Sequence, residues 1–136
     1  MFKNPDSKTI QKVLNDSVSI AVVGVSSDRD KPSYRVAKYL LESGYNIIPV
    51  NPALEEVLGE KCYPSLEDIP YSVDLVDIFR KAEAVPELVD SAIDLKIPVI
   101  WIQEGIHSPQ AAEKAQQAGL QVIMDLCIMK EHRKLC

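Results

Sequence analysis

Short runs of apolar, often β-branched residues alternate with helix-like segments along this chain. The clearest run is Val18–Val23, which ends at Gly24 and is typical of a buried parallel strand. Within Asp6–Asp16, apolar residues recur at spacings of three and four, which predicts a short leading helix on the N-terminal side of that strand.

The same pattern continues to the C-terminus. It predicts five strands, at Val18–Val23, Asn46–Asn51, Val73–Phe79, Pro98–Ile102 and Gln121–Met124. Helices are predicted after the strands, at Pro32–Ser43, Glu83–Leu95, Pro109–Gly119 and Ile128–Leu135. Pro49 interrupts the second strand, which indicates either that the strand ends there or that it lies at an edge of the sheet. The segment Leu54–Leu66 is expected to be irregular.

This alternation predicts an α/β fold, a single Rossmann-like three-layer domain with a mainly parallel five-stranded sheet and helices on both faces. We expect residues 1–17 to form an N-terminal helix packed on the domain, and residues 18–136 to form the domain itself. In such folds ligands bind beyond the carboxyl ends of the strands, near the point where strand order reverses. The residues at the strand ends are therefore the candidates for ligand binding.

The composition of the chain argues against several classes of function. The chain has 136 residues, 46% of them apolar and 26% charged, which suits one soluble globular domain. The net charge of −5 argues against a nucleic-acid partner. No apolar run approaches the roughly 20 residues that cross a bilayer, so no membrane partner is expected. Three cysteines fit neither a zinc site nor a disulfide framework, and free thiols predict a cytoplasmic protein.

The first strand ends in a polar loop that leads to the next helix. Gly24 lets the backbone turn sharply, and free amides at the following helix start can hold a phosphate. Only one glycine of the dinucleotide fingerprint is present. The alternative is an ordinary surface loop with a helix cap. The candidate binding residues here are Gly24, Val25, Ser26, Ser27, Lys31, Ser33 and Arg35.

The second strand ends with Val50, Asn51 and Pro52. NAD-binding domains usually place an acid here to accept the ribose hydroxyls, and an amide supplies no such charge. This lowers the odds of NAD without excluding NADP. An Asn-Pro pair is also a common turn, so a purely structural interpretation stays open.

Arg80 follows the third strand and suits a phosphate because its guanidinium presents a fork of donors. A salt bridge to Glu83 is the structural alternative. Asp74 and Asp77 fall on opposite faces of that strand, so they are not a catalytic pair. One of them is expected to orient Arg80 or to cap a helix.

The remaining candidates lie at the last two strands. Trp101 either covers an adenine or a pantetheine arm or simply belongs to the core, whereas Gln103 and Gly105 lie further out toward a ligand. Cys127 is either a small buried residue or a thiol facing the pocket. No nucleophile elbow or phosphate loop occurs, and the two histidines are not spaced as metal ligands. We therefore expect a binding protein with no catalytic residues and no metal.

The order and spacing of these pieces resemble the stand-alone CoA-binding-domain proteins. The matching segments are Ala21–Ser26, Lys31–Val36, Gly44–Tyr45, Ile48–Pro52, Gly59, Tyr63–Leu66, Val73–Asp74, Asp77–Arg80, Trp101–Gly105, Asp125 and Cys127. That family is similar to the N-terminal CoA-binding domain of the succinyl-CoA synthetase α subunit. The resemblance covers about Val18 to Leu135.

The resemblance implies that coenzyme A lies across the carboxyl ends of the strands. Its nucleotide end would lie over the Gly24–Ser27 loop and Asn51-Pro52, with Lys31, Arg35 and Arg80 near its phosphates. Ile78, Phe79, Trp101 and Gln103 would line the wall toward the pantetheine arm.

Two departures from the family limit this expectation. The synthetase's second domain, with its phosphorylated histidine, has no counterpart here, so a ligase reaction by this chain alone is not expected. Relatives often have Asp-Arg-Cys where this chain has Asp125-Leu126-Cys127, which predicts weaker binding if that arginine contacts the ligand.

The sequence thus predicts a CoA or acyl-CoA binding protein that acts as a carrier, a sensor or an accessory subunit. A small NAD(P)-binding oxidoreductase or nucleotide-sensing domain is the alternative. A protein-interaction scaffold with an unused pocket is a third hypothesis, and a protein partner or a homo-oligomer stays open.

Overall fold

Five parallel strands form the central sheet, in the order β2-β1-β5-β6-β7. The computed structural model describes all residues, 1–136. Every strand expected from the sequence is present, and the α/β fold class is confirmed. The strands are β1 Ser19–Val23, β2 Asn46–Val50, β5 Leu75–Ile78, β6 Val99–Ile102 and β7 Gln121–Met124.

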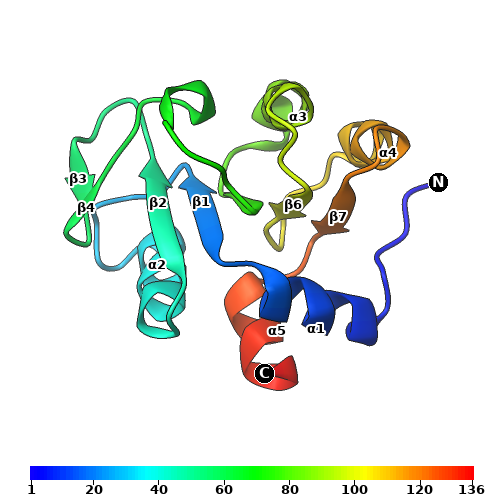
Figure 1. Cartoon of the computed structure of the whole chain (residues 1–136), viewed down its shortest axis with the longest axis horizontal. Helices are drawn as coiled ribbons and strands as arrows, with labels where there is room; N and C mark the ends of the chain where they lie inside the picture. The colour runs from blue at the N-terminus through cyan, green and yellow to red at the C-terminus, as the bar shows by residue number, and fades with distance from the viewer.

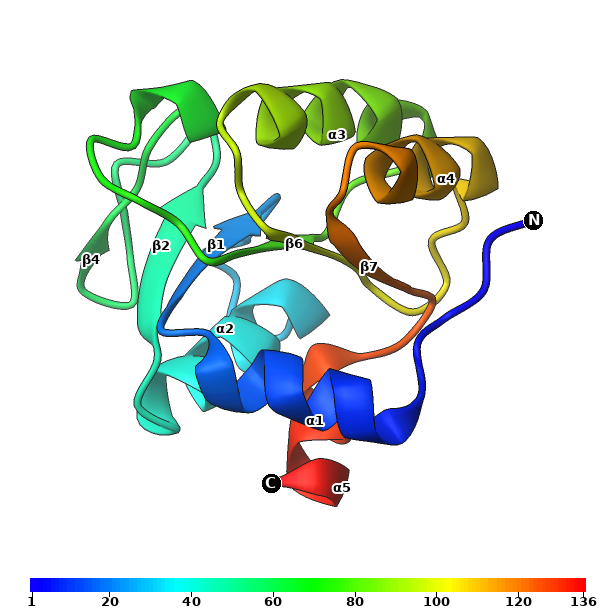
Figure 2. The ribbon, with the colours of Figure 1, turned by 45° about the vertical axis from the view of Figure 1, so that its right-hand side comes forward.

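Helices cover both faces of this sheet (Figures 1 and 2). One face carries α3 (Val85–Asp94) and α4 (Pro109–Gln117), and we call it the α3 face. The opposite face carries α1 (Ser7–Asp16), α2 (Pro32–Glu42) and α5 (Ile128–Leu135), and we call it the α2 face. A 3-10 turn, η2 (Ala82–Ala84), precedes α3, so that helix starts slightly later than the pattern predicted. None of these helices is long and apolar enough to span a membrane.

Strand alternation divides the core into two apolar clusters. Ala21, Val76 and Ile100 point toward the α3 face, whereas Ile20, Leu75 and Trp101 point toward the α2 face. The clusters hold 19 and 17 buried residues, so neither face alone accounts for the core. Burial of both faces is the reason that the strands are almost continuously apolar.

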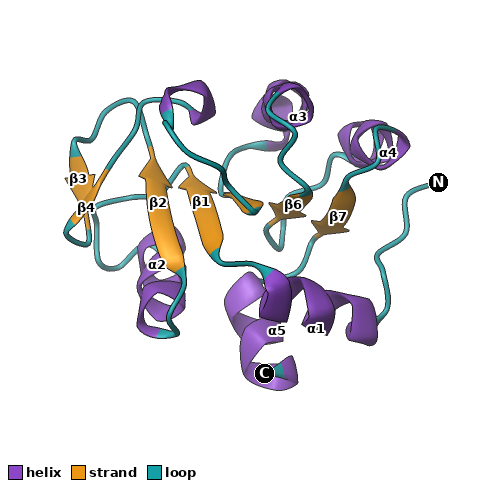
Figure 3. Ribbon diagram, viewed as in Figure 1, coloured by secondary structure: helices purple, strands orange, loops and turns teal.

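The β2 edge of the sheet is covered by a short hairpin (Figure 3). Its strands are β3 (Glu56–Val57) and β4 (Glu60–Lys61), and a 3-10 turn, η1 (Leu66–Asp68), follows. The prediction of an irregular segment was therefore wrong. Leu58 and Gly59 occupy the turn with φ of 57° and 75°, and a leucine there gives no sequence signal for a hairpin. The predicted edge position of β2 is confirmed.

The N-terminal residues close the opposite edge. Asn4 binds the backbone of Met124 twice, through its amide nitrogen and its oxygen, both at 2.8 Å. Asp6 then caps α1 by accepting a hydrogen bond from the Thr9 amide at 2.9 Å. α1 packs beside α5, where Gln11 donates to the Leu135 carbonyl.

Strand order reverses between β1 and β5. From β1 the chain crosses to β2 on one side, and it later returns to β5 on the other side. The backbone connections therefore separate above these two strands, which is where α/β sheets leave a crevice for ligands.

Candidate functional site

Gly24 stands at the centre of this crevice, directly after β1. Its φ is +85°, and a Cβ there would overlap the Phe79 carbonyl oxygen and lie 2.8 Å from the Arg80 Cδ. The Gly24 amide donates to the Val50 carbonyl at 2.9 Å. The glycine thus lets the ends of β1, β2 and β5 approach one another more closely than any side chain would permit.

The loop after Gly24 folds against the start of α2. The Ser33 hydroxyl, buried in the first turn, accepts a hydrogen bond from the Ser26 amide at 3.0 Å. The Ser26 hydroxyl accepts in turn from the Asp28 amide at 3.0 Å. No side chain caps α2, and the Ser33 and Tyr34 amides have no protein acceptor. These donors, at the positive end of the helix dipole, suit an anion.

Asn51 fastens this loop to the end of β2. Its amide nitrogen donates to the Val25 carbonyl at 2.9 Å, and its oxygen accepts from the Ala53 amide at 2.8 Å. The turn interpretation of Asn51 is therefore confirmed. With both ends of its amide engaged, Asn51 contributes to the site mainly by holding the Val25 backbone in place.

Six of the sixteen predicted residues line two hollows near Gly24, and the other ten line neither hollow. The larger hollow, about 750 Å³, lies between α2 and α5 and includes Arg35, Phe79 and Gln103. The smaller, about 180 Å³, lies between the end of β2 and α3 and includes Val50, Pro52 and Arg80. The neighbouring residues Phe79 and Arg80 thus belong to different hollows. Gly24 lies against both of these residues, beside the Phe79 carbonyl and the Arg80 Cδ.

The three candidate cations lie in the segments that follow β1 and β5. Lys31 precedes α2, Arg35 lies in its first turns, and Arg80 follows β5; all three are exposed. None of them forms an ion pair, so the alternative of an Arg80–Glu83 salt bridge is wrong. Their positive charges are available to an anionic ligand.

Three of the predicted residues have no exposed surface. Val25, Ile78 and Trp101 are each 0% exposed. The Trp101 ring is fully enclosed, and its Nε1 donates to the Leu126 carbonyl at 2.8 Å. The core alternative therefore describes Trp101 in this structure. All three residues underlie the crevice, where they support the side chains that line it.

The loops after β6 and β7 are tied together by Asp125. The Gly105 amide donates to the Asp125 Oδ1 at 2.7 Å, and His107 Nε2 lies 3.4 Å from Oδ2. Gln103, which is buried, accepts a hydrogen bond from the Ile128 amide at 3.2 Å and so caps α5. Cys127 is also buried, and it lines the larger hollow.

Asp74, just before β5, and Asp77, within it, do not have the roles that the sequence predicted. Asp74 accepts hydrogen bonds from the Val18 and Ser19 amides at 2.8 and 3.0 Å, at the amino end of β1. Asp77 is fully buried, and neither of its oxygens has a partner. Burial raises the pKa of Asp77 well above its usual value. Neither acid orients Arg80 or caps a helix, so that prediction was wrong.

Sequence reasoning missed much of the wall of the larger hollow. α2 contributes Lys38, Tyr39 and Glu42, which continue from Arg35 at helical spacing. α5 contributes Met129, Lys130 and Arg133. The spacing along α2 was visible in the sequence, but only the fold shows that α5 lies opposite.

Comparison with known proteins agrees with this architecture. A model of the CoA binding domain family matches residues 18–133. The uncharacterized protein YneT of Bacillus subtilis is 39% identical over 131 residues, covering 96% of this chain and 97% of YneT. A solved structure, a hypothetical protein from Pyrococcus horikoshii, superimposes with a TM-score of 0.94 at 39% identity, covering 99% of this chain and 97% of that one.

Longer enzymes contain a similar region. The α subunit of acetate–CoA ligase (ADP-forming) II from Pyrococcus furiosus is 48% identical over 129 residues. The match covers 85% of this chain but only 28% of the ligase subunit. The family expected from the sequence is confirmed: this chain belongs to the CoA-binding domain family.

Proposed function

We propose that this chain binds coenzyme A, free or acylated, across the carboxyl ends of its strands, as a carrier, a sensor or an accessory subunit. The observation that carries the proposal is the pair of hollows lined by the neighbouring residues Phe79 and Arg80, beside Gly24, in a chain of the CoA-binding domain family. A long ligand with a nucleotide at one end and a flexible arm at the other suits such a divided crevice.

The phosphates would lie at the start of α2. The free amides of Ser33 and Tyr34 face this region, and Lys31, Arg35 and Arg80 have no carboxylate partner. Because coenzyme A carries several phosphate charges, unpaired cations and oriented amides together favour it over a neutral ligand.

The two ends of the ligand would then occupy different hollows. The nucleotide end would lie beside Val50 and Pro52, in the smaller hollow next to Arg80. The pantetheine arm would cross Gly24 and follow Phe79 and Gln103 into the larger one. Ser26, Ser27 and Gly105 would border this path from their loops.

No observation favours the NAD(P) alternative. The residue at the end of β2 is Asn51, whose amide already binds Val25 and Ala53. A ribose would therefore meet neither a carboxylate nor a free amide there.

Calorimetric titration with CoA, dephospho-CoA and NADH tests the proposal. We expect CoA to bind more tightly than dephospho-CoA, and Arg80→Gln to reduce that preference about tenfold, since one charge-assisted contact is lost. Lys8→Gln serves as the matched control, because Lys8 is an exposed lysine of α1 outside both hollows. Equal binding of CoA and dephospho-CoA would contradict the phosphate assignment. No binding of CoA, or tighter binding of NADH, would overturn the proposal.

A further inference from the structure

The larger hollow extends well beyond the path assigned to the pantetheine arm. It is lined by Phe79 and Gln103 beside the strand ends and continues between α2 and α5 as far as Glu42 and Arg133. Its volume of about 750 Å³ lies within the range of small-molecule sites. From Pro32 to Glu42 the cleft follows the whole of α2, about 15 Å of helix.

The floor of this cleft is apolar. Val36 of α2, Ile106 after β6 and Met129 of α5 all contribute, together with Phe79 and Cys127 beside the strand ends. Such a surface favours a chain of methylene groups, because contact with the chain removes apolar surface from water.

Charged side chains lie along the rim of the cleft, and basic residues outnumber acidic ones. Four basic residues and two acidic ones line it, namely Arg35, Lys38, Lys130, Arg133, Glu42 and Glu104. Lys130 and Glu104 neutralise each other, with Nζ 2.9 Å from Oε1. Lys38 and Arg133 form no ion pair.

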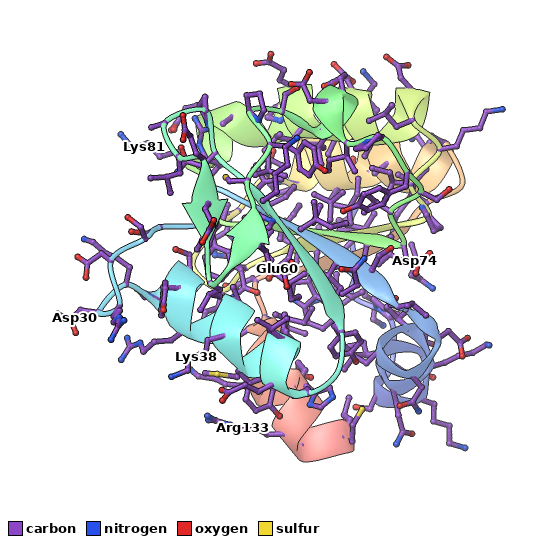
Figure 4. The ribbon with its side chains drawn as sticks, turned by 60° about the vertical axis from the view of Figure 1, so that its left-hand side comes forward. Asp30, Lys38, Glu60, Asp74, Lys81 and Arg133 are labelled. Atoms are coloured by element: carbon purple, nitrogen blue, oxygen red, sulfur yellow. The ribbon has the colours of Figure 1, made fainter.

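Arg133 is held in position by its neighbours. Its guanidinium lies over the Tyr39 ring, 5.2 Å from the centroid. The Tyr39 hydroxyl is fixed in turn by a 2.7 Å hydrogen bond with His132 Nδ1. Figure 4 shows Lys38 on α2 and Arg133 on the neighbouring α5, at the same side of the molecule. Two exposed cations from adjacent helices thus flank the rim of the cleft, on the side away from the strand ends.

We infer that this cleft binds an acyl group that carries its own carboxylate, attached to CoA as a thioester. The inference rests on the proposed function, since the thioester end would enter beside Phe79 and Gln103. The methylene chain would lie on the apolar floor, and the terminal carboxylate would meet Lys38 and Arg133. Glu42, on the same rim, would repel a carboxylate that reached further, which limits the length of the acyl group.

Glutaryl-CoA and valeryl-CoA are the matched probes, because a carboxylate in the first replaces a methyl group in the second. We expect wild-type protein to bind glutaryl-CoA about tenfold more tightly than valeryl-CoA. Lys38→Gln and Arg133→Gln should each remove most of this preference and leave the affinity for CoA unchanged. Lys134→Gln is the control, since Lys134 lies on α5 outside the cleft.

The outcomes separate this inference from the proposed function. If CoA itself does not bind, the proposed function fails and the inference fails with it. If CoA binds while glutaryl-CoA and valeryl-CoA bind equally, only the inference is overturned. If Lys38→Gln and Arg133→Gln weaken CoA as much as glutaryl-CoA, these cations hold the phosphates of CoA, which also overturns the inference. Circular dichroism of each variant confirms that it is folded before titration.

Discussion

The two faces of the sheet bury apolar clusters of similar size, yet they differ in the polar groups that they enclose. The α3 face holds 19 buried residues and the α2 face 17. The α2 face also takes up the unpartnered Asp77 carboxyl, the Gln103 amide and the Trp101 Nε1. The larger hollow opens on that same face, between α2 and α5.

The two faces of the sheet therefore contribute differently to stability and to ligand binding. Apolar packing on both faces accounts for the stability of the sheet. The hydrogen-bonded and titratable groups are concentrated on the face beside the larger hollow. We therefore expect substitutions in the α3-face core away from the smaller hollow to change stability alone, and substitutions on the α2 face to change pH dependence or ligand binding as well.

Gly24→Ala should have the largest effect, because Gly24 lies where the two faces meet. An added methyl group would overlap the Phe79 carbonyl and strain a backbone with φ of +85°. We expect a loss of about 3 to 4 kcal/mol in the free energy of unfolding, and loss of CoA binding. Urea denaturation and calorimetry measure the two effects.

Gly44→Ala provides the matched control for that experiment. Gly44 has φ of +102°, but a Cβ there would meet nothing within 4 Å. Its substitution should cost only the backbone strain, about 1 to 2 kcal/mol, and leave CoA affinity unchanged. Equal losses of stability in the two variants would show that the close contact with Phe79 is unimportant.

Asp77→Val should have the next largest effect, in the opposite direction. Burial raises the pKa of Asp77, so the folded protein binds a proton more tightly than the unfolded chain does. Wild-type stability therefore falls as the pH rises above the unfolded pKa of about 3.9. In the valine variant this decrease should be absent, and the free energy of unfolding at neutral pH should be higher than in the wild type by about 1 to 3 kcal/mol. Urea denaturation at several pH values from 3 to 8 measures this difference in the free energy of unfolding.

Two further variants test whether the Asp77 carboxyl causes the pH dependence of the free energy of unfolding. Asp77→Asn keeps the shape but cannot titrate, so it should flatten the pH dependence while it retains a buried polar group. Val76→Ala, on the opposite face of β5, should lower stability at every pH and leave the slope unchanged. If the dependence of stability on pH persists in both Asp77 variants, it arises from another titratable group.

The sequence predicted the elements of this fold well because each strand is a local apolar run. β1 and β6 are buried at every position, and their sequences contain only small or apolar residues. The hairpin was missed because Leu58, a residue with no preference for a left-handed turn, occupies one.

The site was predictable only where it lies at strand ends. Gly24, Phe79 and Arg80 follow directly from that rule, whereas the cleft wall on α5 depends on contact between segments distant in sequence. Likewise, the lack of a partner for Asp77 depends on its register, which sets Val22 and Trp101 beside it. No local pattern reveals either feature.

His132→Gln should have the smallest effect, again on the α2 face. Burial lowers the pKa of His132, so the unfolded chain binds the proton more tightly than the folded protein does. The contribution of His132 to stability should therefore fall as the pH drops below the unfolded pKa of about 6.5, opposite in sign to the contribution of Asp77, so it is measured in the Asp77→Val background. Because the ring is only partly shielded from water, we expect a loss of less than about 1 kcal/mol between pH 7 and pH 5. His132→Gln should remove this loss, whereas His107→Gln, in a loop outside the α2–α5 contact, should retain it. If His107→Gln rather than His132→Gln removes the loss of stability, the acid sensitivity arises in the loop around Asp125. The α2 face would then not differ from the α3 face in its response to low pH.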